Sequence, residues 1–192
     1  MVALDALRPL LTRTAMVLLP RAAVTMTAAG AGVGWESSIV DLRGELPVSV
    51  ERHYTTSAES KVEGMVWHHT ATSGQTLRSI AEYHVQVKHW PGIAYHYAIG
   101  WDGRVYLLND PTTRSYHTQG WNSRTISVVL VGNYQEHTPS AAMMRSAEHL
   151  SDHLRERYGL RYALLHRQTK PTLCPGDNAV QVLTPMLFGK PM

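Results

Sequence analysis

The only cysteine of the chain, Cys174, lies in a Pro-Gly loop eight positions after His166. His166 ends the apolar run "RYALLH", so a loop that leaves a strand end at His166 could turn the thiol back towards the imidazole. A lone cysteine is most often a small buried hydrophobe, but Cys174 does not lie in an apolar run. A zinc ion that keeps one open coordination position needs three ligands such as imidazole and thiolate. We therefore expect a third ligand from another strand end.

A second strand end with imidazoles occurs in the segment "MVWHHTAT", residues 65–72. An apolar run precedes His68 and His69, and a small polar run follows them. Neighbouring side chains on a strand point to opposite faces, so only one of the two histidines can face a shared site. The periodicity alone does not say which one, and both stay candidates.

The segments that carry these residues read as a compact α/β unit. We predict strands over residues 63–70, 94–100, 104–108, 125–134 and 161–166. The segment 125–134 is a near-continuous apolar run, which is typical of a central strand covered on both faces. Asp102 and Gly103, between two of these strands, indicate a hairpin turn.

Two helices are predicted from apolar spacing and capping residues. The first covers residues 76–89, and its apolar side carries Leu77, Ile80, His84 and Val87. The second starts near Thr138, which can cap it, with Pro139 in the first turn, and ends at Gly159. Its apolar stripe carries Met143, Ala147, Leu150, Leu154 and Tyr158.

The composition suits one domain with an extension. A chain of 192 residues with 44% apolar content can bury one sizeable core, and a single cysteine excludes an internal disulfide. The net charge of +3 comes from scattered Lys and Arg without a basic stripe, so we expect no nucleic-acid partner. Residues 1–37 form an N-terminal extension, which is a tail, a packed segment or a secretion signal, and residues 38–192 form the domain. The apolar run "TAMVLL" in the extension is too short to span a membrane, so we expect no stable membrane insertion.

Four blocks of the sequence occur in a characteristic order and spacing: "VWHHTAT", "GIAYHYAIGWDGRVY", "SYHTQGWNSRTISVVLVGNY" and "HRQTKPTLCPGD". They resemble the zinc-dependent N-acetylmuramoyl-L-alanine amidases, a family that includes phage endolysin amidases and peptidoglycan recognition proteins. The resemblance runs from about residue 63 to residue 177. It implies a single α/β domain with a central mixed β-sheet flanked by helices. It also implies hydrolysis of the amide bond between N-acetylmuramic acid and L-alanine in peptidoglycan, at one zinc ion.

The resemblance implies a set of metal ligands. The first zinc ligand of the family directly follows the apolar run of the first strand, which matches His68, with His69 as the second choice. The other two ligands match His166 and Cys174. Two neutral imidazoles and one thiolate would leave the ion a position at which water is activated.

Two further residues match catalytic positions of the family. Tyr95 matches an active-site tyrosine, although it could be an ordinary strand aromatic. Two positions before the cysteine, some members carry lysine and others threonine; this chain has Thr172, and Lys170 is out of register. We expect Tyr95 and Thr172 to position the water and to stabilise the oxyanion.

Five side chains are candidates for contact with the substrate. His117 matches a histidine that lines the substrate groove of the family, although it could be a solvated loop histidine. Trp121 and Asn122 stand beside it in the sequence, and His69 adjoins the expected ligand His68. Trp90 lies in a polar loop and could stack on a sugar ring.

These features predict a zinc metalloamidase whose partner is peptidoglycan and which acts as a monomer in the cell wall or periplasm. A phage endolysin or a lysin carried on a phage particle fits best, and a secreted bacterial enzyme of wall turnover is the alternative. A non-catalytic peptidoglycan-binding module of the same fold stays open, as does a hydrolase with Cys174 as nucleophile and His166 as base. We expect the N-terminal extension to contact a membrane or another protein.

Overall fold

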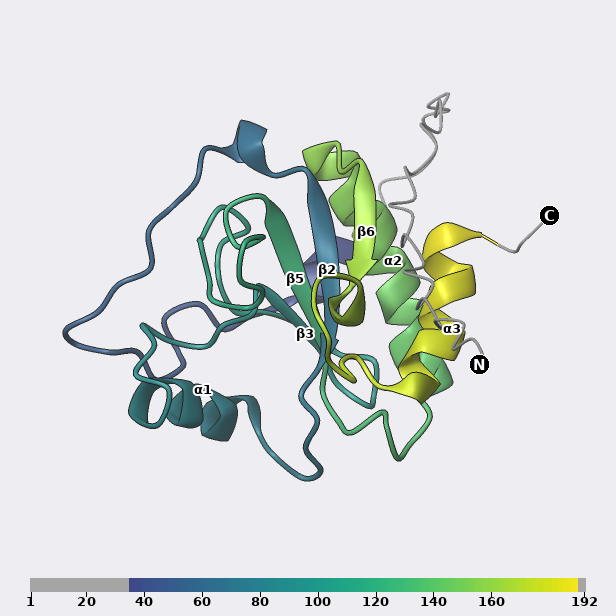
Figure 1. The fold of residues 1–192 in the computed structure, drawn as a ribbon, viewed down its shortest axis with the longest axis horizontal. Helices are drawn as coiled ribbons and strands as arrows, with labels where there is room; N and C mark the ends of the chain where they lie inside the picture. Colours follow the sequence, from purple (N-terminus) through teal and green to yellow (C-terminus); the bar gives the residue numbers. More distant parts are fainter. Residues whose placement is uncertain (1–34, 190–192) are drawn as a thin grey trace, which may run out of the picture.

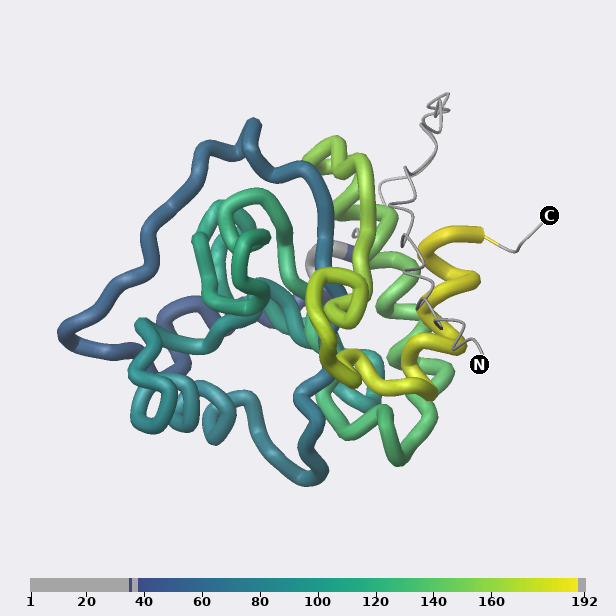
Figure 2. The backbone as a smooth tube through the Cα atoms, viewed as in Figure 1, coloured from purple at the N-terminus to yellow at the C-terminus, as the bar shows by residue number. Residues whose placement is uncertain are grey.

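The computed structural model of the protein describes residues 35–189 (Figures 1 and 2). Its strands are β1 (Val40–Asp41), β2 (Gly64–His69), β3 (Tyr97–Ile99), β4 (Val105–Leu107), β5 (Thr125–Leu130) and β6 (Tyr162–Leu165). Its helices are α1 (Leu77–Gln86), α2 (Ala141–Tyr158) and α3 (Asp177–Phe188), with short 3-10 turns η1 (Trp35–Ser38), η2 (Glu59–Lys61) and η3 (His166–Gln168). The predicted N-terminal extension lies, up to residue 34, outside the described residues, and the division at residue 38 stays a prediction.

The strands form one mixed sheet in the order β1-β4-β3-β5-β2-β6. Of the described strand pairs, β3 and β4 alone are antiparallel, and the predicted turn at Asp102 and Gly103 joins them. Gly103 has a φ of 83°, a conformation that other residues rarely adopt. The predicted fold class, a central mixed sheet flanked by helices, is confirmed.

Two inner strands of the sheet, β2 and β5, are buried along their whole length. Their sequences, "GMVWHH" and "TISVVL", are apolar on both faces for most of their length, as expected for strands covered on both sides. They pair in parallel over six residues, from Gly64 opposite Thr125 to His69 opposite Leu130. The strand that ends in the two histidines, β2, therefore has a paired strand on each side, β5 and β6.

Alternation along β2 divides the core between the two faces of the sheet. Met65 and Trp67 point to one face and join the large apolar cluster that includes residues of α2 and α3. Val66 points to the other face, on which α1 packs through Ile80. Figure 1 shows α1 on one side of the sheet and α2 with α3 on the other. The face to which a strand residue points thus decides which helices it meets.

Both predicted helices form, with shifted ends. α1 begins after Thr76, whose side chain accepts a hydrogen bond from the Ser79 N–H, and it ends at Gln86, three residues earlier than predicted. Val87, predicted on the apolar side, is 59% exposed because the chain has left the helix there. α2 is capped by Ser140 rather than Thr138, and it ends at Gly159 as predicted, where the glycine is left-handed.

The third helix, α3, was not predicted from the sequence. Its buried residues Ala179, Leu183 and Leu187 recur every four positions, which is a helical spacing, but Pro185 interrupts the pattern. α3 packs on α2 and completes the large apolar cluster. Among residues 35–189, no helix combines the length and the apolar character that crossing a membrane requires.

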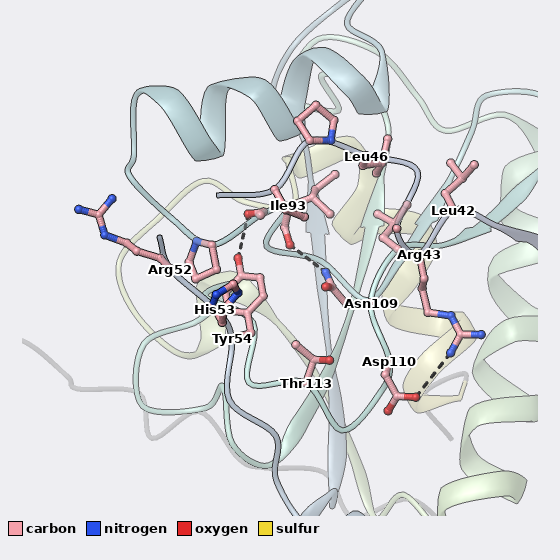
Figure 3. Close-up of a pocket in the computed structure, with 16 residues that line it drawn as sticks. Leu42, Arg43, Leu46, Arg52, His53, Tyr54, Ile93, Asn109, Asp110 and Thr113 are labelled. Atoms are coloured by element: carbon pink, nitrogen blue, oxygen red, sulfur yellow. Dashed lines mark hydrogen bonds and ion pairs between the residues drawn. The ribbon is translucent and has the colours of Figure 1, made fainter. Parts of the chain in front are cut away.

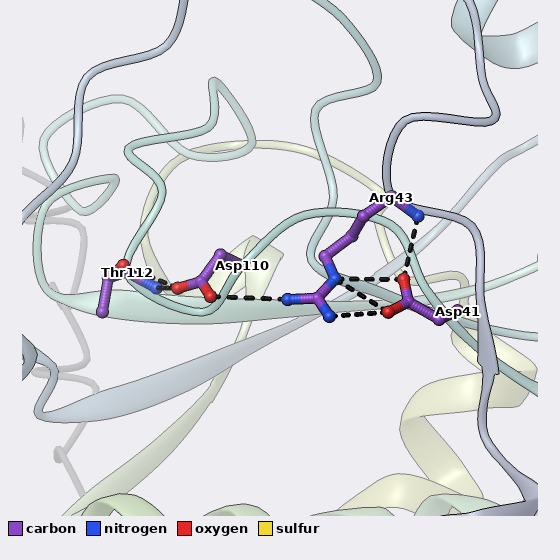
Figure 4. A network of polar contacts seen from close by, with 4 residues as sticks. All are labelled: Asp41, Arg43, Asp110 and Thr112. Carbon is purple, nitrogen blue, oxygen red and sulfur yellow. Dashed lines mark hydrogen bonds and ion pairs between the residues drawn. The ribbon is translucent and has the colours of Figure 1, made fainter.

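An ion-pair network ties the segment after β1 to the loop after β4 (Figure 4). The Arg43 guanidinium contacts the Asp41 carboxylate at 2.6 Å and the Asp110 carboxylate at 3.6 Å. Hydrogen bonds from Arg43 lower the pKa of Asp41. These side chains are about half exposed, and exposed pairs contribute roughly 0–1 kcal/mol. The network therefore sets the path of the loop more than the stability of the fold.

A pocket of about 340 Å³ lies between residues 42–54 and the loops that contain Ile93 and Asn109 (Figure 3). Its wall is stiffened by two hydrogen bonds, from the Tyr54 hydroxyl to the Gly92 carbonyl and from the Asn109 amide to the Ile93 carbonyl. None of the catalytic, metal or substrate candidates lines it.

Two buried histidines brace the fold as hydrogen-bond acceptors. Nδ1 of His84 accepts from the Ala94 N–H, and Nδ1 of His96 accepts from the Ser127 N–H at 2.9 Å. Nε2 of His96 contacts the Thr113 carbonyl at 2.8 Å. Burial lowers the pKa of each ring to about 4, so both are neutral at pH 7. His96, next to Tyr95 in the chain, thus has a structural role.

We expect metal-free protein to lose stability as the pH falls from about 6.5 towards 4. The unfolded chain takes up protons in this range that the buried rings of His84 and His96 cannot accept, which contributes up to roughly 3 kcal/mol per ring. Urea unfolding in EDTA at several pH values measures the slope. His84→Asn keeps an acceptor near the position of Nδ1 and should flatten the slope, whereas His137→Asn, at an exposed position, should not. A wild-type stability that is constant over this range would contradict the assignment.

Candidate metal centre

The register of two parallel strands brings His68 and His166 together. β2 and β6 pair with Trp67 opposite Leu165, so the residues that follow, His68 and His166, are neighbours whose side chains lie on the same face. Adjacent strands lie about 4.8 Å apart. The ring centroids of the two histidines lie 4.5 Å apart. The pairing of the backbone alone thus accounts for the approach of two imidazoles that are far apart in the sequence.

The side chain of His69 points to the opposite face of β2. Its Nδ1 accepts a hydrogen bond from the Tyr134 N–H at 3.1 Å, beside the cluster that α2 and α3 cover. The reason is strand alternation, because His69 shares its face with Met65 and Trp67. The structure therefore brings His68, and not His69, to His166, and it leaves the buried ring of His69 outside the candidate site.

Cys174 reaches the two histidines through the loop that follows η3. Its Sγ accepts a hydrogen bond from the His69 N–H at 3.4 Å and lies 3.7 Å from Nδ1 of His68. The ligand atoms of His68, His166 and Cys174 all lie within 4.8 Å of one another. Within residues 35–189, this is the one group of three or more such side chains that could hold a metal ion.

The loop that carries Cys174 is fixed at both ends. The Arg167 N–H donates to the Cys174 carbonyl at 3.0 Å, and the Arg167 guanidinium bonds the Asp177 carboxylate at 2.7 Å. Gly176 has a φ of 95°, and a Cβ there would lie 2.3 Å from the backbone of Tyr134. A larger residue at this position would push the loop away, so the glycine of "CPGD" is required for the close approach.

The protonation states of the three side chains suit a transition metal. Burial lowers the pKa of His68 well below its ordinary value and that of His166 to about 4, so both rings are neutral with a lone pair available. Burial raises the pKa of the Cys174 thiol to about 11, so without a metal the thiol stays protonated at neutral pH. A divalent ion that displaces this proton would gain a thiolate ligand.

A buried nitrogen supports the fit of a metal to these residues. Nε2 of His166 is buried and has no hydrogen-bond partner among the described residues, although such atoms usually have one. Two imidazoles and one thiolate are the donor set of catalytic zinc sites with an open position. The residues present therefore fit one zinc ion, as the sequence predicted.

The catalytic candidates Tyr95 and Thr172 both lie beside this cluster. The ring of Tyr95, just before β3, is 5.5 Å from the ring of His68. Burial, together with the nearby Cys174, raises the pKa of the Tyr95 hydroxyl, so it remains a hydrogen-bond donor at neutral pH. The Oγ1 of Thr172 accepts a hydrogen bond from the Cys174 N–H at 3.3 Å.

His117 lies next to His68 and is buried rather than solvated. Its Nδ1 is 3.3 Å from Nε2 of His68, and its ring is 7% exposed. The Thr118 hydroxyl contacts both rings, and the Thr125 hydroxyl contacts the ring of His117. Neither threonine was predicted from the sequence, in which the only available signal is the position of Thr118 directly after His117.

The other substrate candidates lie in the surrounding loops. Oδ1 of Asn122 accepts a hydrogen bond from the Thr118 N–H at 2.7 Å, so Asn122 holds the loop that carries His117. Trp121 packs against Tyr162, with the Arg124 guanidinium 4.6 Å from its ring centroid. Trp90 contacts His84 at a ring-centroid distance of 4.9 Å and is half-buried. The structure therefore gives each of these three side chains a partner within the protein.

Comparison with known proteins gives a consistent result. The family profile "N-acetylmuramoyl-L-alanine amidase" (Amidase_2) matches residues 58–177. An N-acetylmuramoyl-L-alanine amidase of Sus scrofa is 37% identical over 117 residues, which cover 59% of this chain and 20% of that protein. Peptidoglycan-recognition protein SC2 of Drosophila simulans is 34% identical over 134 residues, which cover 64% of this chain and 73% of that protein. The chain thus spans about a fifth of the mammalian relative and nearly three quarters of the insect one.

Solved structures show the same fold. The N-acetylmuramoyl-L-alanine amidase LysC from Clostridium intestinale superposes with a TM-score of 0.63 at 27% identity, over 76% of this chain and 94% of that chain. Peptidoglycan recognition protein LE, solved in complex with tracheal cytotoxin, superposes with a TM-score of 0.71 at 21% identity, over 80% of this chain and 97% of that chain. At that identity the second likeness concerns the fold alone.

Proposed function

The chain belongs to the N-acetylmuramoyl-L-alanine amidase family, and on that premise we propose that it hydrolyses the amide bond between N-acetylmuramic acid and L-alanine in peptidoglycan with one zinc ion. The observation that carries the proposal is the convergence of His68, His166 and Cys174, whose ligand atoms lie within 4.8 Å of one another. The names of the matching mammalian relatives support the choice of bond.

In the proposed reaction, each residue of the site has a separate role. His68, His166 and Cys174 would hold the ion through two neutral imidazoles and a thiolate. When bound, zinc in such a donor set polarises a carbonyl and lowers the pKa of water to around 7. The Tyr95 hydroxyl donates a hydrogen bond to the substrate oxygen on which negative charge develops. As the amide bond breaks, it would relay the proton lost by the attacking water to the departing amine, so that the tyrosine ends protonated as it began. Thr172 accepts from the Cys174 amide with its Oγ1 and directs its own hydroxyl proton to the substrate.

Two alternatives are less well supported by the same residues. A nucleophilic cysteine needs a lowered pKa, whereas burial raises the pKa of Cys174 to about 11. The imidazole that its Sγ contacts, at 3.7 Å from Nδ1, is that of His68 and not that of the expected base His166. A non-catalytic binding module has no need of a complete ligand set, and this chain has all three ligands.

We expect hydrolysis of purified peptidoglycan to stop in EDTA and to return with zinc but not with magnesium, which prefers oxygen ligands. The readout is the release of new L-alanine amino termini together with free muramoyl carboxyl groups. Hydrolysis that persists in EDTA and stops on thiol alkylation would instead support Cys174 as a nucleophile. Peptidoglycan that is bound by the zinc-loaded protein but left intact would support the binding module.

We further propose that the chain acts as a monomer on the cell wall, as an endolysin or a lysin carried on a phage particle. A structural neighbour at 27% identity, from Clostridium intestinale, is named an endolysin amidase, which supports this setting. The alternative is a secreted bacterial enzyme of wall turnover. Mass spectrometry of the natural protein distinguishes the phage lysin from the secreted enzyme. A chain cleaved within residues 1–37 would support secretion and contradict the assignment as an endolysin.

A further inference from the structure

A chain of hydrogen bonds leads from a backbone carbonyl to the ring of His68. Nε2 of His68 lies 3.3 Å from Nδ1 of His117, and Nε2 of His117 lies 3.5 Å from Oγ1 of Thr125. The Thr125 hydroxyl is 2.8 Å from the Trp121 carbonyl. Both imidazole rings are buried, with exposures of 1% for His68 and 7% for His117.

The proton positions along this chain of hydrogen bonds follow from the Trp121 carbonyl at its end. A carbonyl can only accept, so the Thr125 hydroxyl donates to Trp121 and its oxygen accepts from Nε2–H of His117. A neutral imidazole carries one proton, so Nδ1 of His117 accepts, and Nε2 of His68 must be its donor. Nδ1 of His68, which lies 3.7 Å from the Cys174 sulfur, is then left with a lone pair.

The hydroxyl of Thr118 is consistent with the same proton positions. Its Oγ1 lies 3.4 Å from Nε2 of His68 and 3.0 Å from Nδ1 of His117. It can accept from the first nitrogen and donate to the second. Both nitrogens of His117 are therefore engaged inside the protein, so the ring has no hydrogen bond left to offer to a substrate.

We propose that His117 is a positioning residue that holds His68 in the Nε2–H tautomer and directs its Nδ1 lone pair at the metal. The proposal rests on the proposed zinc-dependent function. It also separates His68 from the structural histidines, because Nδ1 of His69, His84 and His96 each accepts a backbone N–H. Partners of this kind, which orient a metal-bound imidazole, typically change metal affinity 10–100-fold when removed.

The test compares three substitutions at one position. In His117→Asn the amide oxygen can occupy the place of Nδ1 and accept from His68, whereas the longer side chain of His117→Gln places its oxygen near the former Nε2. His117→Leu has no acceptor at all. Zinc dissociation constants are measured by competition with a chromophoric chelator, and the His68 tautomer is read by nitrogen-15 NMR of the metal-free protein. Thermal unfolding in EDTA shows whether each variant is folded.

We expect zinc affinity to fall about 10–100-fold in His117→Leu and in His117→Gln, and to stay near wild type in His117→Asn. The NMR signature of the Nε2–H tautomer should persist in the wild type and His117→Asn only. If the leucine variant does not fold, the Asn and Gln pair still decides the question. Wild-type zinc affinity in folded His117→Gln, or equal losses in the Asn and Gln variants, would overturn the proposal. A wild-type protein that binds zinc but leaves peptidoglycan intact would contradict the proposed function. The zinc affinities of the His117 variants would still test the role of His117.

Discussion

Cys174→Ser should reduce hydrolysis of peptidoglycan below detection and weaken zinc binding by more than about a hundredfold. The serine hydroxyl stays protonated at neutral pH, so the site would lose its only anionic donor and keep two neutral imidazoles. The fold should survive, because the apolar clusters do not include Cys174. Zinc titration and the release of L-alanine amino termini measure the two losses, and unfolding in EDTA measures the stability.

Leu173→Ser is the matched control for this substitution. Leu173 precedes Cys174 in the same loop, and its side chain is 64% exposed. The Leu173→Ser variant should bind zinc and hydrolyse peptidoglycan as the wild type does. Full hydrolytic activity in Cys174→Ser would show that the thiolate is not a ligand and would discard the mechanism.

Tyr95→Phe should lower kcat about 10²–10³-fold and leave the zinc affinity nearly unchanged. The substitution removes one hydroxyl from a side chain whose ring lies 5.5 Å from that of His68, and it keeps the ring packing. Loss of a single donor to a developing oxyanion typically has an effect of this size. Steady-state kinetics on a soluble muropeptide separates kcat from KM, and zinc titration follows the metal.

The control for the tyrosine is Tyr83→Phe. Tyr83 is 46% exposed on α1, so removal of its hydroxyl should leave kcat unchanged. If Tyr95→Phe keeps the wild-type kcat, Tyr95 is the ordinary strand aromatic that its sequence context also allows. An equal loss of zinc affinity and of kcat would instead indicate that the hydroxyl supports the metal site.

The residues that gather at the metal centre were predictable because each ends a strand or follows one. His68 and His166 follow apolar runs. Such runs pair as parallel strands whose carboxyl ends lie at the same end of the sheet. Strand periodicity did not decide between His68 and His69, because alternation shows that two residues face apart without showing which face is which. Only the family resemblance implied His68, and the structure agrees. In the folded chain the Tyr134 N–H, 65 positions later, donates a hydrogen bond to Nδ1 of His69 and holds that ring on the opposite face.

Other features depended on contacts that no local pattern contains. The partner of His68 is His117, 49 positions away in an irregular loop, and only the folded chain brings the two rings together. α3 was missed because Pro185 weakened a helical spacing that packing on α2 supports. The exposure of Val87 follows from the early end of α1, which no glycine marks in the sequence.

β6 is the border strand of the sheet, and β2 is its one neighbour among the described strands. His68 and His166 stand at the ends of these two strands and are 98 positions apart in the chain. An ion gripped by both would close a ring of that length, as a covalent cross-link does. Pairing of β6 with β2 and binding of the ion would then be thermodynamically coupled. The protein would release its metal when β6 separates from β2.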